Sequence, residues 1–300
     1  MNKDLQNCNL CPRACGVNRA EGQLGYCGQT IEVKAARASL HMWEEPCISG
    51  ESGSGTVFFS GCSLRCIYCQ NHHIALGETG KKISIPRLAE IFLELQEKGA
   101  LNINLVTPTH FVPQIVDAIR LAKNEGLTLP IVYNTSGYET IENLKRLEGL
   151  IDIYLPDCKY YSPDLSQKYS NASDYFYVAS AALKEMYRQV GSPVFDEETG
   201  LLKRGMIVRH LVLPGCIEDS KKVLYHLFKT FGHQIYISIM NQYTPVQTHP
   251  QFPELNRTLT QREYDEVVDY AIELGIENGF IQEGETNLES FIPPFDLDGI

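Results

Sequence analysis

The sequence has none of the long apolar runs, and little of the positive charge, that mark proteins of membranes or nucleic acids. Its 300 residues contain no apolar stretch of about 18 residues, the length that suggests a transmembrane helix. Residues 1–7 lack the apolar stretch of a secretory signal. Lys and Arg number 26 against 37 Asp and Glu, which gives a net charge of −11. We therefore expect a cytoplasmic protein with no membrane contact and without the basic surface that binds nucleic acid.

Internal repeats and low-complexity tracts are also missing. Hydrophobic residues make up 43% of the chain and charged residues 21%, proportions typical of a globular protein with a sizeable core. A chain of 300 residues fits one large domain, or one domain with an appendage. We place the boundary near residue 50, with a cysteine-rich segment at 1–50 and a core domain at 51–300.

Cysteine, by contrast, is plentiful, and three of the ten cysteines form a compact motif. Cys62, Cys66 and Cys69 are separated by three and then two residues, just past the apolar run 57–59. This spacing lets one short loop place three thiolates around an iron–sulfur cube, and the missing fourth ligand leaves one iron open. Structural zinc sites usually have four ligands in two pairs, so the motif favours a cluster. A cluster implies a reducing, low-oxygen setting.

A second group of cysteines precedes this motif. Cys8, Cys11, Cys15 and Cys27 lie within twenty residues of low apolar content, so a metal or a cross-link must organise them. In a chain without a secretory signal, metal ligands are favoured over disulfides. Cys11-Pro12 and the single C-x2-C pair favour an auxiliary iron–sulfur centre, whereas the eleven-residue gap before Cys27 also suits zinc. Both metals, and an unmetallated segment, stay open at this point.

The stretch 32–56 joins the two cysteine regions, and its punctuation by glycine and proline predicts a loop. Glu44 and Glu45 are expected to be solvated acids, with a place at the active site as the alternative. Cys47 is expected to be a small buried hydrophobe, with a ligand role as the alternative.

From residue 56 onward, apolar β-rich runs alternate with helical patterns. Strands are predicted at 57–59, 102–107, 131–134, 151–155, 206–213 and 234–240. Helices are predicted near 85–95, 115–121, 139–147, 180–190, 219–231 and 260–274. Such alternation calls for an α/β fold of parallel strands with right-handed crossovers. Periodicity alone fits both a (β/α) barrel and a doubly wound sheet.

The motif C-x3-C-x2-C at 62–69, with an aromatic residue before its last cysteine, resembles that of the radical S-adenosylmethionine (SAM) superfamily. Its extended form at 66–71 is similar to glycyl-radical-enzyme activating enzymes, and the whole chain resembles the PflX family of pyruvate formate-lyase activase homologues. The resemblance implies a partial (β/α)6 barrel with a cysteine-rich N-terminal segment. It also implies that Cys62, Cys66 and Cys69 are the catalytic centre and hold a [4Fe-4S] cluster whose open iron binds SAM.

In these enzymes one electron cleaves SAM to a 5'-deoxyadenosyl radical, chemistry that the cofactors carry and the protein directs. The resemblance therefore implies a low-potential electron donor such as flavodoxin or ferredoxin. It also implies hydrogen abstraction from a glycine of a glycyl-radical partner enzyme. Radical modification of another protein, a peptide or a small molecule is the alternative. An iron–sulfur electron carrier or sensor that never cleaves SAM is an alternative of another class.

The resemblance also suggests roles for residues at the carboxyl ends of the strands, where functional groups gather in parallel α/β folds. Asp157-Cys158-Lys159 is similar to the Asp-Leu-Lys of the activases, which implies that Lys159 meets the SAM carboxylate and that Asp157 orients it. Arg209, in a segment similar to the activases' Arg-x-Val-x-x-Pro-Gly, is expected to contact SAM or the substrate backbone. Cys158 is expected in the core.

Other strand ends depart from the activases. Thr107 and Thr109 stand where a Gly-Gly-Glu segment is usual, and we expect their oxygens to meet the SAM amino group. Asn134 replaces an acid but keeps its hydrogen-bonding capacity. Asn241 stands near the usual ribose histidine and is expected to take its place. His110 is expected to be a local structural residue, with a SAM contact as the alternative.

Two further expectations concern the edges of the site. Tyr68, between two cluster ligands, is expected to lie against the adenine of SAM, and Asn71 is expected in the same cofactor site. Residues 279–285 are expected to close the open side of the barrel.

Overall fold

The computed structural model describes residues 3–282 and 293–300, which form a mixed α/β fold around a largely parallel sheet. The strands are β1 (Val33–His41), β2 (Ser54–Phe59), β3 (Lys81–Ile83), β4 (Ile103–Val106), β5 (Ile131–Thr135), β6 (Ile153–Pro156), β7 (Val194–Phe195), β8 (Leu202–Leu211), β9 (Tyr236–Met240) and β10 (Gly279–Ile281). The helices are α1 (Pro46–Ser49), α2 (His72–Ala75), α3 (Ile85–Glu97), α4 (Val112–Asn124), α5 (Ile141–Lys145), α6 (Pro163–Ser170), α7 (Tyr175–Val190), α8 (Ile217–Phe231) and α9 (Gln261–Glu273).

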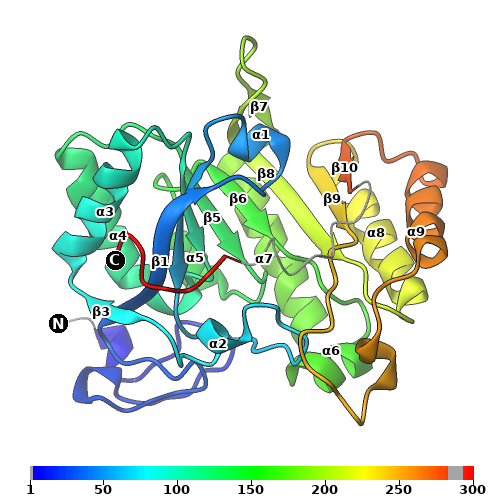
Figure 1. Cartoon of the computed structure of the whole chain (residues 1–300), viewed down its shortest axis with the longest axis horizontal. Helices are drawn as coiled ribbons and strands as arrows, with labels where there is room; N and C mark the ends of the chain where they lie inside the picture. Colours follow the sequence, from blue (N-terminus) through cyan, green and yellow to red (C-terminus); the bar gives the residue numbers. More distant parts are fainter. Residues whose placement is uncertain (1–2, 283–292) are drawn as a thin grey trace.

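The sheet has parallel neighbours over most of its width (Figure 1). Its order is β10-β9-β8-β6-β5-β4-β2-β1-β3, and β7 pairs with β8. Every neighbouring pair from β2 to β10 is parallel, whereas β1 and β3 run antiparallel to their neighbours. Within the described residues the two outermost strands, β10 and β3, do not pair, so the barrel is unclosed. The predicted partial (β/α) barrel with a cysteine-rich N-terminal segment is confirmed.

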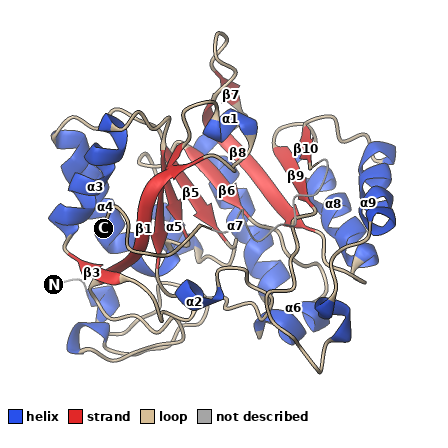
Figure 2. Ribbon diagram, viewed as in Figure 1, coloured by secondary structure: helices blue, strands red, loops and turns tan. Residues whose placement is uncertain are grey.

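Helices cover the outer face of this curved sheet (Figure 2). α3 shows how the sequence builds that layer: the Ser84 side chain caps its start by accepting the backbone N–H of Arg87. Leu88, Phe92 and Leu95 follow at helical spacing and are buried in the main core. Because these apolar side chains share one face of the helix, burying them against the sheet fixes its orientation.

The predicted alternation is present in the fold. Each of the six apolar runs forms a strand, and a helix lies at each of the predicted helical patterns. The loop predicted at 32–56 is wrong, because most of this stretch forms β1, α1 and the start of β2. Three of the nine residues of β1 are alanine, which has little intrinsic preference for strands. Its pairing with β2 and β3 therefore decides its conformation.

The C-terminal residues return to the front of the sheet. Residues 293–300 lie along β1 (Figure 1), where Arg37 pairs with Asp296 at 2.6 Å and Asp298 at 3.1 Å. Of the segment 279–285 that was expected to close the barrel, Gly279–Ile281 extend the sheet edge as β10. Residues 283–285 lie outside the described residues. No helix in the described ranges is long and apolar enough to cross a membrane.

Candidate functional site

A cavity of about 430 Å³ opens on the inner face of the sheet. Residues at the ends of β4, β5, β6, β8 and β9 line it, together with the loop after β2 and the segment between β1 and α1. Cys62, Cys66 and Cys69 all line this cavity. The cysteine motif and the polar strand ends therefore meet in one place, as parallel α/β topology leads us to expect.

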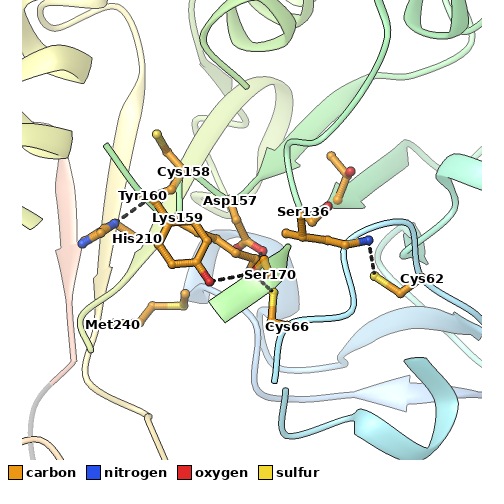
Figure 3. Close-up of polar contacts among 12 residues, drawn as sticks. Cys62, Cys66, Ser136, Asp157, Cys158, Lys159, Tyr160, Ser170, His210 and Met240 are labelled. Carbon is orange, nitrogen blue, oxygen red and sulfur yellow. Dashed lines mark hydrogen bonds and ion pairs between the residues drawn. The ribbon is translucent and has the colours of Figure 1, made fainter. Parts of the chain in front are cut away.

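Hydrogen-bond donors are directed at two of the three sulfurs. The Sγ of Cys62 accepts the backbone N–H groups of Leu64 at 3.3 Å and Arg65 at 3.5 Å. The Sγ of Cys66 accepts the hydroxyl of Ser170, at the end of α6, at 3.0 Å (Figure 3). Such donors stabilise negative charge on sulfur, whether on a thiolate or on the ligand of a cluster.

Two of these thiols are also poorly solvated. Burial raises the pKa of Cys69 to about 12, with smaller contributions from Cys66 and Cys62, and it raises the pKa of Cys62 as well. Coordination to iron reverses this preference, because the thiolate is the form that binds metal. Three thiols on one loop, with donors aimed at sulfur, fit a [4Fe-4S] cluster.

A single metal ion needs ligands that converge on one point. In the described parts of the chain, no three His, Cys, Asp or Glu side chains are arranged to hold one metal ion. The cysteine ligands of a cluster bind different irons, so they need not converge on one point.

Lys159 brings a positive charge to the cavity wall at the end of β6. Its Nζ lies 2.6 Å from Oδ2 of Asp157. Burial lowers the pKa of Lys159, but Asp157 and then the nearby Cys66 outweigh this effect and raise it above its ordinary value. The hydroxyl of Tyr175 accepts the Lys159 backbone N–H at 3.0 Å and lies 2.8 Å from the Ser136 carbonyl. The ammonium is therefore charged and its backbone is held in place.

The two threonines after β4 lie in different surroundings. Thr107 lines the cavity with φ of +58°, a left-handed conformation unusual for a β-branched residue, and its N–H donates to the Asn134 carbonyl at 2.9 Å. Thr109 is buried and donates to Glu139 at 2.6 Å, and its expected SAM contact stays a prediction. His110 is buried and bonds a backbone carbonyl at 2.8 Å, and burial lowers its pKa to about 3. It is a neutral structural residue.

Asn241, at the end of β9, bonds the segment after β10. The backbone N–H of Asn241 donates to Oε1 of Gln282 at 2.8 Å, and its side-chain amide donates to the Gln282 carbonyl at 3.3 Å. Asn241 is not among the described residues that line the cavity, whereas Gln242 and Tyr243 are. The Asn241 amide faces the segment after β10, and its expected ribose contact stays a prediction.

Arg209 lines the cavity, but two acids engage its guanidinium. Its Nε and Nη2 donate to Glu45 at 2.8 Å and 2.5 Å, and Nη2 also donates to Glu44. The Glu44 and Glu45 side chains are 6% and 5% exposed, so the expectation of solvated acids is wrong. The reason is that the segment between β1 and α1 reaches the inner face of the sheet and contacts β8.

Aromatic and amide side chains complete the wall near the cysteines. Tyr68 lines the cavity and packs edge-on against Tyr160, Tyr169 and Tyr243, with ring centroids 6.2 to 6.4 Å apart. Asn71 also lines the cavity, and its Oδ1 is buried without a hydrogen-bond partner among the described residues. An unsatisfied buried acceptor is costly, so this atom suits a donor on a bound molecule.

The N-terminal cysteines come close to one another. Burial raises the pKa of Cys11 to about 12, and Cys27, Cys8 and Cys15 are all near enough to add to that increase. The backbone N–H of the residue before Cys27 donates to Cys15 Sγ at 3.2 Å. The structure thus gathers four thiols that the sequence spreads over twenty residues.

This N-terminal segment packs directly under the cysteine loop. The Arg13 guanidinium donates to the backbone carbonyls of Ser63 at 2.8 Å and Ser170 at 2.9 Å. A Cβ on Gly61, whose φ is +86°, would meet the Cys27 carbonyl at 2.6 Å. Only glycine therefore allows this close approach of the two cysteine regions.

The sequence did not point to Ser170, and it led us to expect Glu44 and Glu45 to be solvated. Ser170 lies 104 residues from Cys66, and nothing in the local sequence points to their contact. Glu44 and Glu45 carry one weak signal, a pair of adjacent acids in an otherwise apolar neighbourhood. Only the path of the chain after β1 shows that they are buried.

Comparison with known proteins agrees with this geometry. Residues 56–204 match the model of the Radical SAM superfamily, a range that begins in β2 and includes Cys62, Cys66, Cys69, Asp157 and Lys159. The chain therefore carries a radical SAM superfamily domain. The family implies a [4Fe-4S] cluster and SAM as cofactors.

Among individual proteins, the uncharacterised protein MJ0674 of Methanocaldococcus jannaschii is 27% identical over 277 residues, which cover 89% of this chain and 75% of that protein. Among solved structures, HydG, a maturase of the [FeFe]-hydrogenase, is similar with a TM-score of 0.51 and 17% identity over 74% of this chain. The chain spans half the length of HydG, and this likeness concerns the fold. A domain of a pyruvate-formate lyase-activating enzyme from Bacteroides vulgatus gives a TM-score of 0.40 and 11% identity, covering 58% of this chain and 92% of that domain.

Proposed function

We propose that Cys62, Cys66 and Cys69 hold a [4Fe-4S] cluster and that the cavity beside them binds SAM for reductive cleavage. One observation carries the proposal: three thiols on one loop and the ion-paired Lys159 line a single cavity inside a radical SAM domain. A mere electron carrier has no need of such a cavity.

When bound, the cluster supplies one electron that breaks the sulfonium C–S bond of SAM and yields a 5'-deoxyadenosyl radical for hydrogen abstraction. The residues of the chain orient and shield the reactants. Lys159 offers a charge-assisted hydrogen bond to the SAM carboxylate, and Asp157 holds its side chain. Asn71, Asn134 and Thr107 offer polar contacts along the wall. Buried aromatic side chains at the cysteine loop exclude water.

Within this reaction class we propose activation of a glycyl-radical partner, with an electron from a donor such as flavodoxin or ferredoxin. The support is the similarity of residues 66–71 to the activases and of the whole chain to the PflX family. Thr107 and Asn134, which depart from the activase pattern, favour a second candidate: radical modification of another protein, a peptide or a small molecule.

We also propose that Cys8, Cys11, Cys15 and Cys27 hold an auxiliary iron–sulfur centre or a zinc ion. The support is their proximity to one another beside the cysteine loop, where Cys8, Cys11 and Cys27 are buried and Cys15 is exposed. We propose that this cysteine-rich unit ends before residue 33, since β1 belongs to the sheet. Iron and zinc analysis of the full chain, compared with a Cys8→Ala, Cys11→Ala double variant, identifies the metal.

Anaerobic reconstitution with iron and sulfide, followed by dithionite and SAM, tests the main proposal. The wild-type protein should form 5'-deoxyadenosine, and Cys62→Ala, Cys66→Ala and Cys69→Ala should each abolish it together with the cluster absorbance. Cys216→Ala, outside the cavity lining, is the matched control. A loaded cluster without 5'-deoxyadenosine contradicts the proposal. A doublet radical signal on mixing with a glycyl-radical enzyme separates the first candidate from the second.

A further inference from the structure

The cavity has a second charged end, away from the cysteine loop. Its lining includes residues of the segment between β1 and α1 as well as those of the loop that precedes α2. Figure 1 shows α1 and α2 at opposite ends of the sheet. The cavity therefore extends from the cysteine loop toward the segment that carries Trp43, Glu44 and Glu45.

The charges at this second end do not balance. Arg209 forms a two-bond fork with Glu45 through Nε and Nη2, a geometry that pairs one guanidinium with one carboxylate. Glu44 shares only Nη2 of the same guanidinium and accepts the side-chain amide of Asn104 at 2.8 Å. Counting the Asp157–Lys159 pair, the described lining has three carboxylates against two cations, a net charge of −1.

A carboxylate that is 6% exposed and has only part of a counter-charge is costly to maintain, because burial removes its hydration. Glu44 has acceptor capacity beyond its two present bonds. A cation brought in by a ligand would complete its shell and relieve the cost.

Asn104 supplies an independent observation at the same place. The residue is fully buried on β4, and its Oδ1 has no hydrogen-bond partner among the described residues. Because side chains alternate along a strand, Asn104 shares the inner face with Val106, which lines the cavity. The Asn104 amide therefore holds the Glu44 carboxylate at the cavity wall, while its buried Oδ1 adds to the local excess of acceptors.

Trp43 and His41 also lie at this end of the cavity. Trp43 lines the cavity beside Glu44 and is 61% exposed, which places an aromatic side chain at the same end of the cavity. His41 also lines the cavity, and burial lowers its pKa. His41 is therefore neutral at pH 7 and does not supply the missing positive charge.

We propose that this end of the cavity binds a protonated amine or guanidinium group of the substrate, with Glu44, held by the Asn104 amide, as the acceptor and Trp43 beside the cation. The assignment rests on the proposed function and names the class of its substrate: a molecule with a basic group at one end and the reacting C–H bond toward the cysteine loop. A lysine or arginine side chain of a peptide and a free amine share this chemistry. In the opposing account, the Glu44–Glu45–Arg209 group only anchors the segment between β1 and α1.

Calorimetric titration of the cluster-loaded, SAM-bound full chain distinguishes these accounts. The probes are cadaverine, N-acetyl-lysinamide and, as a neutral control, 1-pentanol. Both cations should bind the wild type more tightly than pentanol, and Glu44→Gln should weaken their binding at least about tenfold. Glu218→Gln, an exposed acid on α8, should leave it unchanged. Equal cation affinity in the wild type and Glu44→Gln, or no preference over pentanol, overturns the proposal.

Trp43→Ala provides a second variant, because a largely exposed side chain can be removed without emptying the core. It should weaken cation binding about 2- to 5-fold, the range of an accessible cation–π contact. Tighter binding of N-acetyl-lysinamide indicates a peptide source, and tighter binding of cadaverine a small amine. The amine titration does not depend on turnover, and it decides the substrate class. Absence of 5'-deoxyadenosine from the loaded wild type counts against the proposed function instead.

Discussion

Ser170 donates its hydroxyl to the Sγ of Cys66 at 3.0 Å, across a sequence separation of 104 residues. The Tyr160 hydroxyl lies 2.7 Å from the same Oγ (Figure 3). It also lies 2.8 Å from the Tyr68 hydroxyl. A serine hydroxyl has one proton, so Ser170 can serve Cys66 while accepting from Tyr160. The end of α6 thus supports the sulfur of a proposed cluster ligand.

Replacing this serine should change the reduction potential of the reconstituted cluster. A hydrogen bond to a ligand sulfur stabilises the reduced, more negative cluster more than the oxidised one. Ser170→Ala should therefore lower the potential by roughly 20–65 mV, the one-electron equivalent of about 0.5–1.5 kcal/mol. A redox titration followed by electron paramagnetic resonance measures the shift. Ser166→Ala on the same helix, whose hydroxyl bonds only the Pro163 carbonyl, is the control. An equal potential in both variants contradicts the role of Ser170.

Loss of the Lys159 charge should weaken SAM binding. The variant Lys159→Met keeps the length of the side chain but removes the partner of Asp157 and the proposed contact with the SAM carboxylate. Charge-assisted hydrogen bonds contribute about 1.5–3 kcal/mol, so the dissociation constant should rise by about 10- to 100-fold. Titration of SAM into cluster-loaded protein gives the value. The exposed Lys123→Met at the end of α4 should bind SAM as the wild type does, and equal affinities in both variants count against the contact.

Glu139 should make the protein less stable as the pH rises. Its Oε1 accepts the hydroxyls of Thr109 and Thr135 at 2.6 Å and of Tyr133 at 3.1 Å, while its Oε2 is buried with no hydrogen-bond partner in the part of the chain that the structure describes. Burial raises the pKa of Glu139 from 4.5 to about 7. The folded state therefore binds more protons than the unfolded state between these two values, and the free energy of unfolding falls across that interval.

The variant Glu139→Gln removes this titration and keeps an acceptor for the three hydroxyls. At pH 8 it should be more stable than the wild type by on the order of 3 kcal/mol, with the difference vanishing below pH 4.5. Urea unfolding at a series of pH values measures the slope. Glu142→Gln, exposed on the neighbouring α5, should retain the wild-type profile. An unchanged profile in Glu139→Gln shows that another group causes the slope.

Arg13 should control how long the cluster is retained. Its guanidinium donates to the carbonyls of Ser63 and Ser170, which flank the sulfur ligands on two sides, and it contacts the Leu64 carbonyl at 3.4 Å. Arg13→Ala removes these bonds, each about 1.5–3 kcal/mol when charged, so the cluster should be lost to a chelator at least about tenfold faster. Arg13→Lys should lie between, because an ammonium cannot reproduce the planar fork. Decay of the cluster absorbance under anaerobic chelation tests this, and wild-type decay in Arg13→Ala would be evidence against it.

Much of the fold was predictable because its signals are local. Leu88, Phe92 and Leu95 repeat at helical spacing, and the parallel strands are short apolar runs that need no partner to be recognised. β1 was not predictable, because its three alanines gain strand character only through pairing with β2 and β3.

The candidate site likewise has residues whose position was predictable and residues whose position was not. Asp157 and Lys159 line the cavity because they directly follow the end of β6, and the carboxyl ends of parallel strands converge at one edge of a sheet. Thr109 and Asn241 also follow strands, yet each turns toward other protein groups: Thr109 toward Glu139, Asn241 toward Gln282. Which side of the backbone a residue faces after a strand depends on dihedral angles such as the positive φ of Thr107, which sequence spacing does not encode.

By itself, the sequence determined the alternating α/β pattern and the loop of Cys62, Cys66 and Cys69, because both depend on spacing within a few neighbouring residues. Only the tertiary structure decided what surrounds that loop. The hydroxyl of Ser170 at Cys66 and the burial of Glu44 against Arg209 join residues more than a hundred positions apart. Such contacts arise from the packing of distant segments around one sheet, and they set the electrostatics of the cavity in which the chemistry is proposed to occur.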